Sequence, residues 1–367
     1  MKPFIHEQEQ WPYFYWQQER LAEQLGEVRR RQGQLIGRME GLGFQVCAEA
    51  VLQSLTEETI KSSEIEGESL DRAQVRSSLA RRLGMDVGGL VPSNRSVEGV
   101  VEMMLDATQR FAVPLTTQRL FQWHAALFPT GRSGMVKIRV GKWRDDHRGP
   151  MQVVSGSFGK EKVHFQAPDA HRLKREMRLF LSWLNGKTAL DAVVKAGVAH
   201  LWFVTLHPFE DGNGRIARAI ADLQLARSEG SSQRFYSLSA QVSLERNAYY
   251  NILEATQRGG LDITAWLEWF LGCLGRAFGG AEILLEVVLR KARFWAAHRE
   301  EQFNVRQRQL INRLLDGFEG KLTSSKWAAL GKCSQDTASR DIDDLVRRNI
   351  LVKNPAGGRS TSYTLCN

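Results

Sequence analysis

The sequence predicts a mainly α-helical protein that carries one β-hairpin and a small winged module near its C-terminal end. Apolar residues recur at helical spacing over most of the chain, as at Leu21, Leu25 and Val28. The helical pattern breaks between residues 131 and 168, where two short β-type runs flank Gly and Ser. In the last segment, short helical stretches are followed by two short apolar runs. These three features define the fold class.

The composition is that of a water-soluble globular protein with room for two or three domains. The chain has 367 residues, with 43% hydrophobic and 25% charged residues. It contains no apolar run of 18 residues and no apolar signal core near the N-terminus, so we expect a cytoplasmic protein without a membrane partner. The net charge of +9 suits an anionic partner, either a nucleotide or a nucleic acid. Scattered cysteines without metal-type spacing indicate free thiols: Cys47, Cys273, Cys333 and Cys366.

The N-terminal region should be helical. We expect helices at about 17–41 and 56–65, the second ending at Glu66 and Gly67. The aromatic cluster at 11–16 either packs into the core or stacks on bases, and we favour packing. A further amphipathic helix is expected at about 97–112, with Ser93 or Ser96 as its N-cap.

A hairpin and two helices follow. Val and Phe residues around Ser155, Gly156 and Ser157 predict a β-hairpin at about 151–165. Helices are expected at about 169–185 and 190–206. The second is apolar on nearly all sides, which predicts a buried central helix. His200 in this helix is expected to be a hydrogen-bonded core residue.

The C-terminal segment has the element order of a winged helix. The expected helices span about 306–315, 324–330 and 334–348, and strands at 350–352 and 363–365 flank a wing tip at 354–358. From residue 293 onward there are 13 Lys and Arg against 8 Asp and Glu, a balance that suits DNA. Acidic residues on the third helix weaken that interpretation: Asp336, Asp341, Asp343 and Asp344. Both a DNA partner and a protein partner stay open.

The most informative stretch is residues 207–218, which read as a phosphate cradle. Its two glycines let the backbone approach an anion, and the following residues form a helix whose N-terminus favours anions. Arg215 and Arg218 lie three residues apart and can grip two phosphate groups. Asp211 is a hard oxygen ligand suited to Mg²⁺, and His207 can take a proton near neutral pH. The residues alone predict a Mg²⁺-dependent nucleotide or phosphate site.

This stretch resembles the Fic motif, HPFx(D/E)GNGRxxR, at every defined position. The resemblance implies a Fic helical core that transfers AMP from ATP to a Ser, Thr or Tyr hydroxyl of a target protein. It makes His207 the general base and Asp211 the Mg²⁺ ligand. It also makes Arg215 the pyrophosphate-binding residue and Arg218 the γ-phosphate-binding residue. The backbone amides of Gly212, Asn213 and Gly214 would form the anion hole. Pro208 and Phe209 would anchor the loop.

The resemblance extends to residues outside this stretch. Gly214 favours nucleotidyl transfer, because Doc-like relatives carry Lys at the equivalent place and transfer phosphate. The hairpin at about 151–165 would be a flap on which the target docks by strand addition. Nucleotide contacts would come from three residues further along the chain: Asn247, Tyr249 and Tyr250.

A second short motif lies in the N-terminal region. Residues 62–67 resemble the inhibitory motif (S/T)xxxE(G/N) of autoregulated Fic proteins, with defined positions at Ser62, Glu66 and Gly67. The resemblance implies that Glu66 forms an ion pair with Arg218 and so competes with the γ-phosphate for its guanidinium.

Taken together, the sequence predicts a helical N-terminal domain with an inhibitory helix (1–90), a Fic catalytic domain (91–300) and a winged-helix-like domain (301–367). The predicted function is protein adenylylation that is inhibited by Glu66. Two alternatives stay open: removal of AMP at the same site, and a nucleotide-sensing transcriptional regulator that binds DNA. The sequence also leaves a homo-oligomer open.

Overall fold

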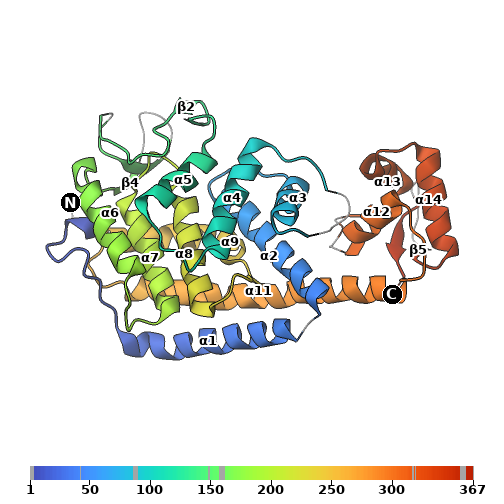
Figure 1. The fold of residues 1–367 in the computed structure, drawn as a ribbon, viewed down its shortest axis with the longest axis horizontal. Coiled ribbons are helices and arrows are strands. Elements are labelled where there is room, and N and C mark those ends of the chain that lie inside the picture. The colour runs from blue at the N-terminus through green and yellow to red at the C-terminus, as the bar shows by residue number, and fades with distance from the viewer. Residues whose placement is uncertain are drawn as a thin grey trace. The chain divides into compact units, whose positions relative to one another are not determined.

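The computed structural model describes residues 4–41, 43–85, 90–147, 149–156, 162–315, 318, 320–355 and 361–366. Within them the chain is mainly helical, with three two-stranded antiparallel sheets, which confirms the expected fold class (Figure 1). The chain divides into two compact units, one of residues 1–85 and 91–282 and one of residues 86–90 and 283–367. The three-domain division expected from the sequence stays a prediction.

The first unit holds the helices and hairpins that build the site. Its elements, together with the start of α11, are η1 (Ile5–Glu7), α1 (Gln18–Glu40), α2 (Phe44–Ile65), α3 (Arg72–Arg82), α4 (Arg95–Gln109), α5 (Thr117–Leu127), β1 (Arg132–Ser133), β2 (Val136–Lys137), β3 (Gln152–Ser155), β4 (Lys162–Gln166), α6 (Ala170–Asn185), α7 (Ala192–Leu206), α8 (Asn213–Glu229), α9 (Leu238–Leu244), α10 (Arg246–Gln257) and α11 (Thr264–Ala297).

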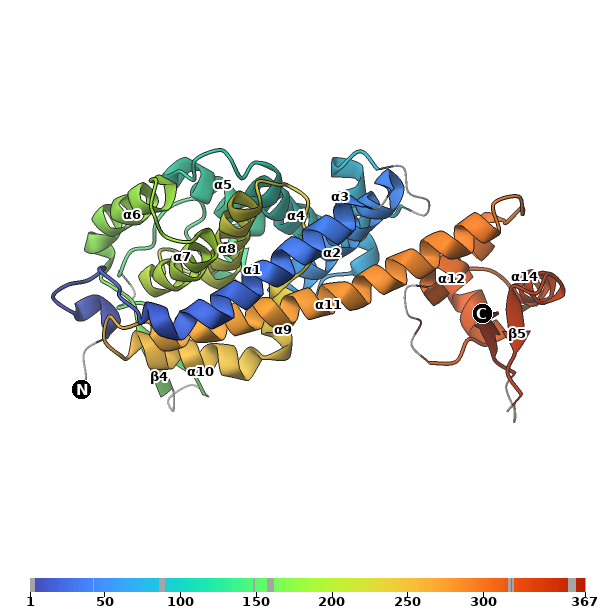
Figure 2. The same ribbon diagram turned by 90° about the horizontal axis from the view of Figure 1, so that it is seen from below.

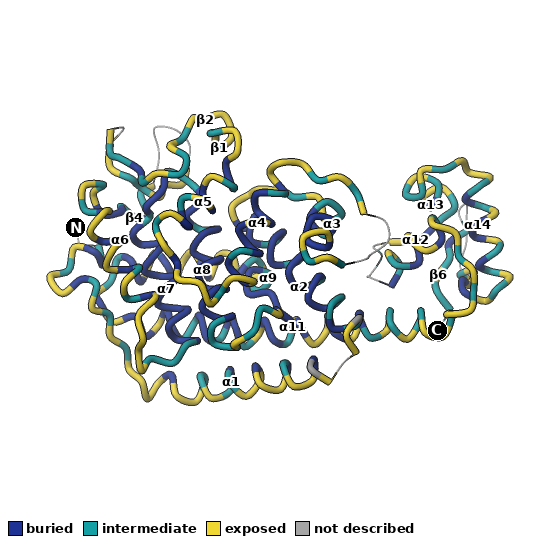
Figure 3. The backbone as a smooth tube through the Cα atoms, in the orientation of Figure 1, coloured by how far each residue is buried: buried dark blue, intermediate teal, exposed yellow. Residues whose placement is uncertain are grey.

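Helices α7 and α8 form the centre of this unit, and nearly every residue of both is buried (Figure 3). His200 in α7 accepts or donates a 2.9 Å hydrogen bond with the Tyr249 hydroxyl, as expected for a core histidine. The N-terminal aromatic cluster also packs inward, because Trp11 and Phe14 make edge contacts with Trp202 of α7. The buried helix pair therefore provides a rigid base for the loop between α7 and α8.

Helix α1 runs beside the first half of α11 in the same direction, as both ribbon views show (Figures 1 and 2). Arg20 pairs with Glu268 at one end of the contact, at 2.8 Å, and Arg38 lies 3.8 Å from Glu282 at the other. Between these ion pairs α1 buries an apolar stripe, so it forms an outer cover for the unit.

Two helix starts differ from the expectation. Helix α2 begins at Phe44 rather than near Thr56, and its N-cap Gly43 offers no side-chain hydrogen bond that the sequence could signal. Helix α4 is capped by Asn94, whose side chain accepts from the Val97 amide at 2.9 Å. The expected caps, Ser93 and Ser96, were therefore wrong by one and two positions.

The hairpin expected at about 151–165 is present as β3–β4, and residues 157–161 lie outside the described part of the chain. Strand β4 is fastened to α10: His164 Nδ1 lies 2.6 Å from Glu254, and Arg258 donates to the His164 carbonyl at 2.9 Å. Strand β3 is mostly exposed. The sequence did not predict the short β1–β2 hairpin.

The second unit contains α12 (Val305–Leu315), α13 (Ser324–Gly331), α14 (Gln335–Arg347), β5 (Leu351–Lys353) and β6 (Tyr363–Leu365), close to the expected bounds. Trp327 and Ile342 lie in its apolar core. Asp341 and Asp344 point partly inward, where Asp341 pairs with Arg306 at 2.9 Å and Asp344 with Arg348 at 3.1 Å. Part of the expected wing tip, residues 356–358, is not described.

Two general expectations can be compared with the described residues. None of their helices combines the length and the apolar character needed to cross a membrane. All four cysteines carry free thiols, with Cys47 and Cys273 buried.

Gly99→Ala should destabilise the first unit, because α4 packs closely on α5 at this position. An added Cβ would lie 1.8 Å from the Ala126 carbonyl oxygen. Overpacking of this kind costs about 1–3 kcal/mol or more in the free energy of unfolding. Urea unfolding measures it, with Gly33→Ala as the control. Gly33 lies in α1 with nothing within 4 Å of an added Cβ, so that change should stabilise by about 0.5–1 kcal/mol. Equal midpoints for the two variants would contradict the close α4–α5 contact.

Candidate active site

The loop between α7 and α8 reverses the chain through two residues in left-handed conformations. His207 ends α7 with φ 47°, and Gly212 caps α8 with φ 79°. An added Cβ at Gly212 would lie 2.9 Å from the Phe128 ring, so both the backbone angle and the close approach favour glycine. The turn brings the imidazole and the amides of the first turn of α8 into one place.

Asn213 holds the loop closed from inside. Its Oδ1 accepts from the Phe209 amide at 3.0 Å, and its Nδ2 donates to the Phe209 carbonyl at 2.8 Å. The Phe209 ring is fully buried and stacks on His124 at a centroid distance of 4.2 Å. Pro208 is buried as well, and its carbonyl accepts from the Arg144 amide at 2.9 Å. Both expected anchors, Pro208 and Phe209, are therefore buried on the side of the loop that faces the core.

His207 is arranged as a neutral base. Its Nδ1 lies 3.3 Å from the Val204 carbonyl, which leaves Nε2 as the nitrogen with a lone pair. Burial lowers the pKa of His207 to about 4, and the Arg144 guanidinium adds to the decrease. The imidazole is therefore uncharged near neutral pH and can accept a proton.

Asp211 faces the mouth of the loop. Its Oδ1 accepts from the Gly212 amide at 2.6 Å, and its Oδ2 accepts a short hydrogen bond from the Ser133 hydroxyl on β1. Each carboxylate oxygen keeps lone-pair capacity beyond these bonds. The carboxylate is thus positioned beside the anion cradle by two neighbours, one of which the sequence did not suggest.

Arg218 lies almost fully buried against the end of α2. Its Nη2 donates to Glu66 Oε1 at 2.8 Å and to the Ser62 carbonyl at 2.7 Å, and its Nε donates to the Ser62 hydroxyl at 3.0 Å. The contact expected from the sequence is present, and Gly67 follows with φ 83°. An added Cβ at Gly214 would lie 2.0 Å from Glu66 Oε1, so the carboxylate occupies the space above the first turn of α8.

Arg215 has a partner that sequence reasoning missed. Its Nη1 donates to Glu68 Oε2 at 2.5 Å, and its guanidinium lies 5.1 Å from the centre of the Phe128 ring. Glu68 follows the inhibitory motif by one residue, and only its acidic character could have drawn attention to it. The segment after α2 therefore occupies both arginines of the loop.

These two arginines keep unused hydrogen-bond donors. Among the described residues, Arg218 Nη1 and Arg215 Nε are buried without a partner. Arg218 Nη1 lies 3.3 Å from the Cβ position of Gly214, and so it faces the cradle. Buried donors of this kind suit an anion with several oxygen atoms, such as a polyphosphate.

The three residues expected to contact the nucleotide lie in three different environments. Tyr249 is buried beside His200, and burial raises its pKa. The Tyr250 hydroxyl donates to the Ile65 carbonyl at 3.2 Å, at the end of α2. Asn247 is exposed. Tyr250 therefore lies next to the inhibitory segment, and Tyr249 supports the core behind it.

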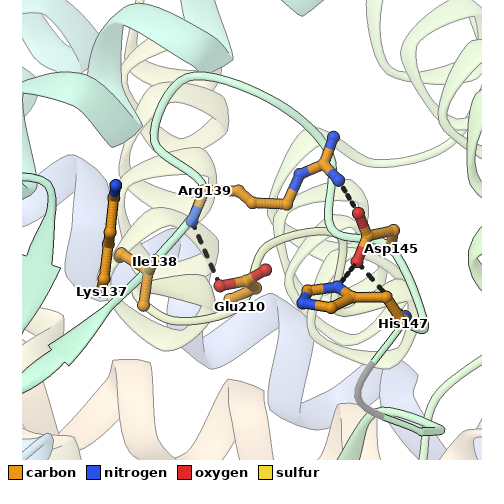
Figure 4. Close-up of a pocket in the computed structure, with 6 residues that line it drawn as sticks. All are labelled: Lys137, Ile138, Arg139, Asp145, His147 and Glu210. Carbon is orange, nitrogen blue, oxygen red and sulfur yellow. Dashed lines mark hydrogen bonds and ion pairs between the residues drawn. The ribbon is translucent and has the colours of Figure 1, made fainter.

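A separate open pocket of about 330 Å³ lies beside Glu210 (Figure 4). It is lined by the end of the β1–β2 hairpin and by residues of the segment that follows it: Lys137, Ile138, Arg139, Asp145 and His147. Asp145, His147 and Glu210 offer possible metal-ligand atoms within 4.8 Å of one another. Asp145 contacts both Arg139 and His147, and Glu210 accepts from the Arg139 amide at 3.1 Å. Arg139 balances the charge of Asp145, and Asp211 is not among the pocket residues.

The structure is that of a helical protein whose α7–α8 loop brings a neutral histidine and two buried arginines to one helix N-terminus. Residues 114–225 match the model of the Fic/DOC family, and residues 4–85 match a domain of unknown function, DUF4172. The chain therefore carries a Fic domain that includes the whole loop.

Known proteins agree with this assignment. The chain is similar to the protein adenylyltransferase Fic of Drosophila yakuba, at 26% identity over 216 residues, and to that of Aedes aegypti, at 27% over 218 residues. These matches cover 57% and 58% of this chain but 38% of each relative, so the chain spans well under half of their length. A Fic family protein from Desulfovibrio desulfuricans G20 shares the fold, with a TM-score of 0.53, 22% identity, and coverage of 96% of this chain and 98% of that one.

Asn213→Ala should loosen the loop, because the Phe209 amide and carbonyl would lose their partners while remaining buried. We expect a loss of about 1–3 kcal/mol in the free energy of unfolding, measured by urea denaturation. Asn247→Ala removes the same side chain from an exposed position and should stay within about 0.5 kcal/mol of the parent. A similar small effect for both variants would show that Asn213 does not hold the loop.

Proposed function

We propose that this protein transfers AMP from ATP to a Ser, Thr or Tyr hydroxyl of a target protein, and that its own α2 segment inhibits the transfer. The observation that carries the proposal is the loop of residues 207–218, which combines a neutral histidine base with two buried arginines held by internal carboxylates. The names of the similar proteins support the reaction type.

The chemistry follows from the positions of the groups. The acceptor hydroxyl attacks the α-phosphorus of ATP, the bond from that phosphorus to the β-phosphate bridging oxygen breaks, and pyrophosphate leaves. His207 Nε2 takes the hydroxyl proton. The free amides in the first turn of α8 and the arginine side chains would stabilise the phosphate charge, Arg215 on the departing pyrophosphate and Arg218 on the γ-phosphate.

The residues present fit a Mg²⁺ ion bound together with ATP. Asp211 is a hard oxygen ligand beside the anion cradle, and its carboxylate is oriented by Ser133 and the Gly212 amide. When bound, Mg²⁺ would neutralise charge on the α- and β-phosphates. Asp211 would hold it there, and phosphate oxygens would complete its coordination.

Inhibition is proposed to work by competition for the two guanidinium groups. Glu66 takes Arg218, and Glu68 takes Arg215. With both carboxylates in place, the γ-phosphate loses its partner and the α-phosphate is not aligned for in-line attack. The two pairs differ in strength, because the Glu68 side chain is 47% exposed whereas that of Glu66 is 31% exposed.

The target is proposed to dock on the β3–β4 flap. Strand β4 is fastened to α10, and β3 exposes Val153 and Val154. An exposed strand can pair with an extended segment of another protein through main-chain hydrogen bonds. This would bring the target's hydroxyl toward the loop.

Removal of AMP is the second candidate, favoured by the position of Glu66. Its carboxylate lies over Gly214, above the first turn of α8, and a carboxylate there could orient a water molecule toward a bound phosphate. Release of AMP from a modified protein measures this reaction. For the C-terminal unit both a DNA and a protein partner stay open, because its helix α14 exposes Asp336 and Asp343 as well as Arg340 and Arg347.

His207→Ala should abolish transfer while ATP binding stays nearly unchanged, because the imidazole acts on the acceptor hydroxyl. Loss of a general base costs on the order of 10²–10⁴-fold in kcat. Labelled AMP incorporation and calorimetric ATP titration measure the two effects. His171→Ala, a change at an exposed histidine, is the control and should leave both unaltered.

The transfer rate of the parent protein should be constant from pH 8 to about 5 and should fall as the pH drops through about 4, because only the neutral imidazole of His207 is a base. A fall near pH 6.5 would contradict the buried, neutral base.

Glu66→Gly should raise transfer on the order of 10²-fold, and Glu68→Gln should raise it less, because the exposed pair is weaker. The double variant should exceed either single one. In an Arg218→Ala background, Glu66→Gly should have no further effect, since both groups act through one contact. Incorporation of labelled AMP at fixed ATP and Mg²⁺ measures all forms. Glu64→Gly is the matched control, because Glu64 pairs with Lys61 at 2.6 Å instead of the loop. Equal rates for the parent and Glu66→Gly would refute inhibition by α2.

A further inference from the structure

Arg144 is a buried cation that lies outside the Fic motif, between β2 and β3. Its side chain is only 1% exposed. Burying a guanidinium is costly unless its donors are satisfied. The partners of Arg144 therefore indicate what the residue does.

Two of its hydrogen bonds hold the start of the loop between α7 and α8. Arg144 Nε donates to the His207 carbonyl at 2.8 Å, and the Arg144 amide donates to the Pro208 carbonyl at 2.9 Å. Side chain and backbone thus hold two consecutive carbonyl groups at the start of the loop.

The other end of the guanidinium holds the flap. Arg144 Nη1 donates to Asp146 Oδ1 at 2.7 Å, and Nη2 makes a short bond to the Pro168 carbonyl, just after β4. The second oxygen of Asp146 accepts from the Ala170 amide at 2.5 Å, at the start of α6. One side chain therefore joins the base of the flap to the loop that carries His207.

His207 needs such a support because of its backbone conformation. A non-glycine residue at φ 47° lies in the left-handed region, which an L-residue adopts only at a cost of about 1 kcal/mol or more. The left-handed turn places the ring beneath the cradle, and a fixed carbonyl keeps the turn from relaxing. Because a misplacement of about 1 Å can cost on the order of 10²-fold in rate, this support matters for catalysis.

We infer that Arg144 is a positioning residue: it holds the His207 carbonyl and the Pro168 carbonyl together, and so fixes the distance between the base and the docked target. This inference rests on the proposed AMP transfer for its effect on rate. Its effect on His207 itself does not depend on the reaction.

The electrostatics support the same role. Three charged groups act on His207: Arg144 lowers its pKa, whereas Glu66 from α2 and Asp211 from the loop raise it. Removing the guanidinium should therefore raise the pKa of His207. Lysine at this position would keep the charge but could reach only one of the two carbonyls.

The test uses full-length protein with Glu66→Gly as the active parent. Arg144→Met and Arg144→Lys are compared with Arg119→Met. Arg119 is a matched control, because it is also buried and donates to backbone carbonyls, those of Val113 at 2.8 Å and Asp106 at 2.6 Å, away from the loop. The measurements are kcat, KM for ATP, the thermal midpoint, and the titration of His207 by NMR of ¹³C-labelled histidine.

Arg144→Met should lower kcat on the order of 10–10²-fold, leave KM for ATP within about twofold, and raise the pKa of His207. Arg144→Lys should keep that pKa near the parent value and recover part of kcat. Arg119→Met should lower the thermal midpoint alone. If Arg144→Met does not fold, the lysine variant decides through a lowered kcat at unchanged KM.

Two results would overturn the inference. One is a kcat for both Arg144 variants that matches the Arg119 control. The other is an unchanged His207 titration in folded Arg144→Met. A parent that transfers no AMP to any protein would instead refute the proposed function, and the NMR titration would still decide whether Arg144 governs His207.

Discussion

The short reversal between α7 and α8 is the constraint on which the site depends. Because both helices are buried along nearly their whole length, the chain between them has no freedom to spread outward. It turns through His207 and Gly212, and Asn213 closes it against Phe209. The same turn that joins the helices also sets the base beside a helix N-terminus. The backbone angles of His207 and Gly212 therefore both connect the packed helices and place the imidazole beside the start of α8.

A buried helix that carries arginine must supply each guanidinium with a partner. Helix α8 carries Arg215 and Arg218 in a setting where water cannot fully solvate them. Either an internal carboxylate or an external phosphate can fill this need. Ser62 on α2 also accepts two hydrogen bonds from Arg218, which hold the guanidinium while α2 is in place. The described structure shows the first of these arrangements, with Glu68 on Arg215 and Glu66 on Arg218.

The sequence predicted this site well where the chemistry is local. The loop of residues 207–218 is contiguous, so its motif specified the turn, the cradle and the arginines together. The Glu66–Arg218 contact, 152 residues apart, was predicted only through the resemblance of a short motif. Glu68, Ser133, His124 and Arg144 escaped notice, because each acts through a contact with a residue distant in sequence. The early start of α2 was missed for a similar reason: Gly43 gives no capping signal, and residues 44–55 bury more than one face.

The unequal exposure of the two acidic partners has a consequence for how the protein responds to its surroundings. Mobile ions screen charges in contact with solvent within about 10 Å at 0.1 M salt, whereas buried pairs are screened much less. We therefore expect salt to weaken the Glu68–Arg215 pair more than the Glu66–Arg218 pair, because the Glu68 side chain is 47% exposed and that of Glu66 31%. If the segment after α2 separates from the loop, we expect the contact of Glu68 to break before that of Glu66. Ionic strength is therefore expected to act on the Arg215 side of the cradle more than on the Arg218 side.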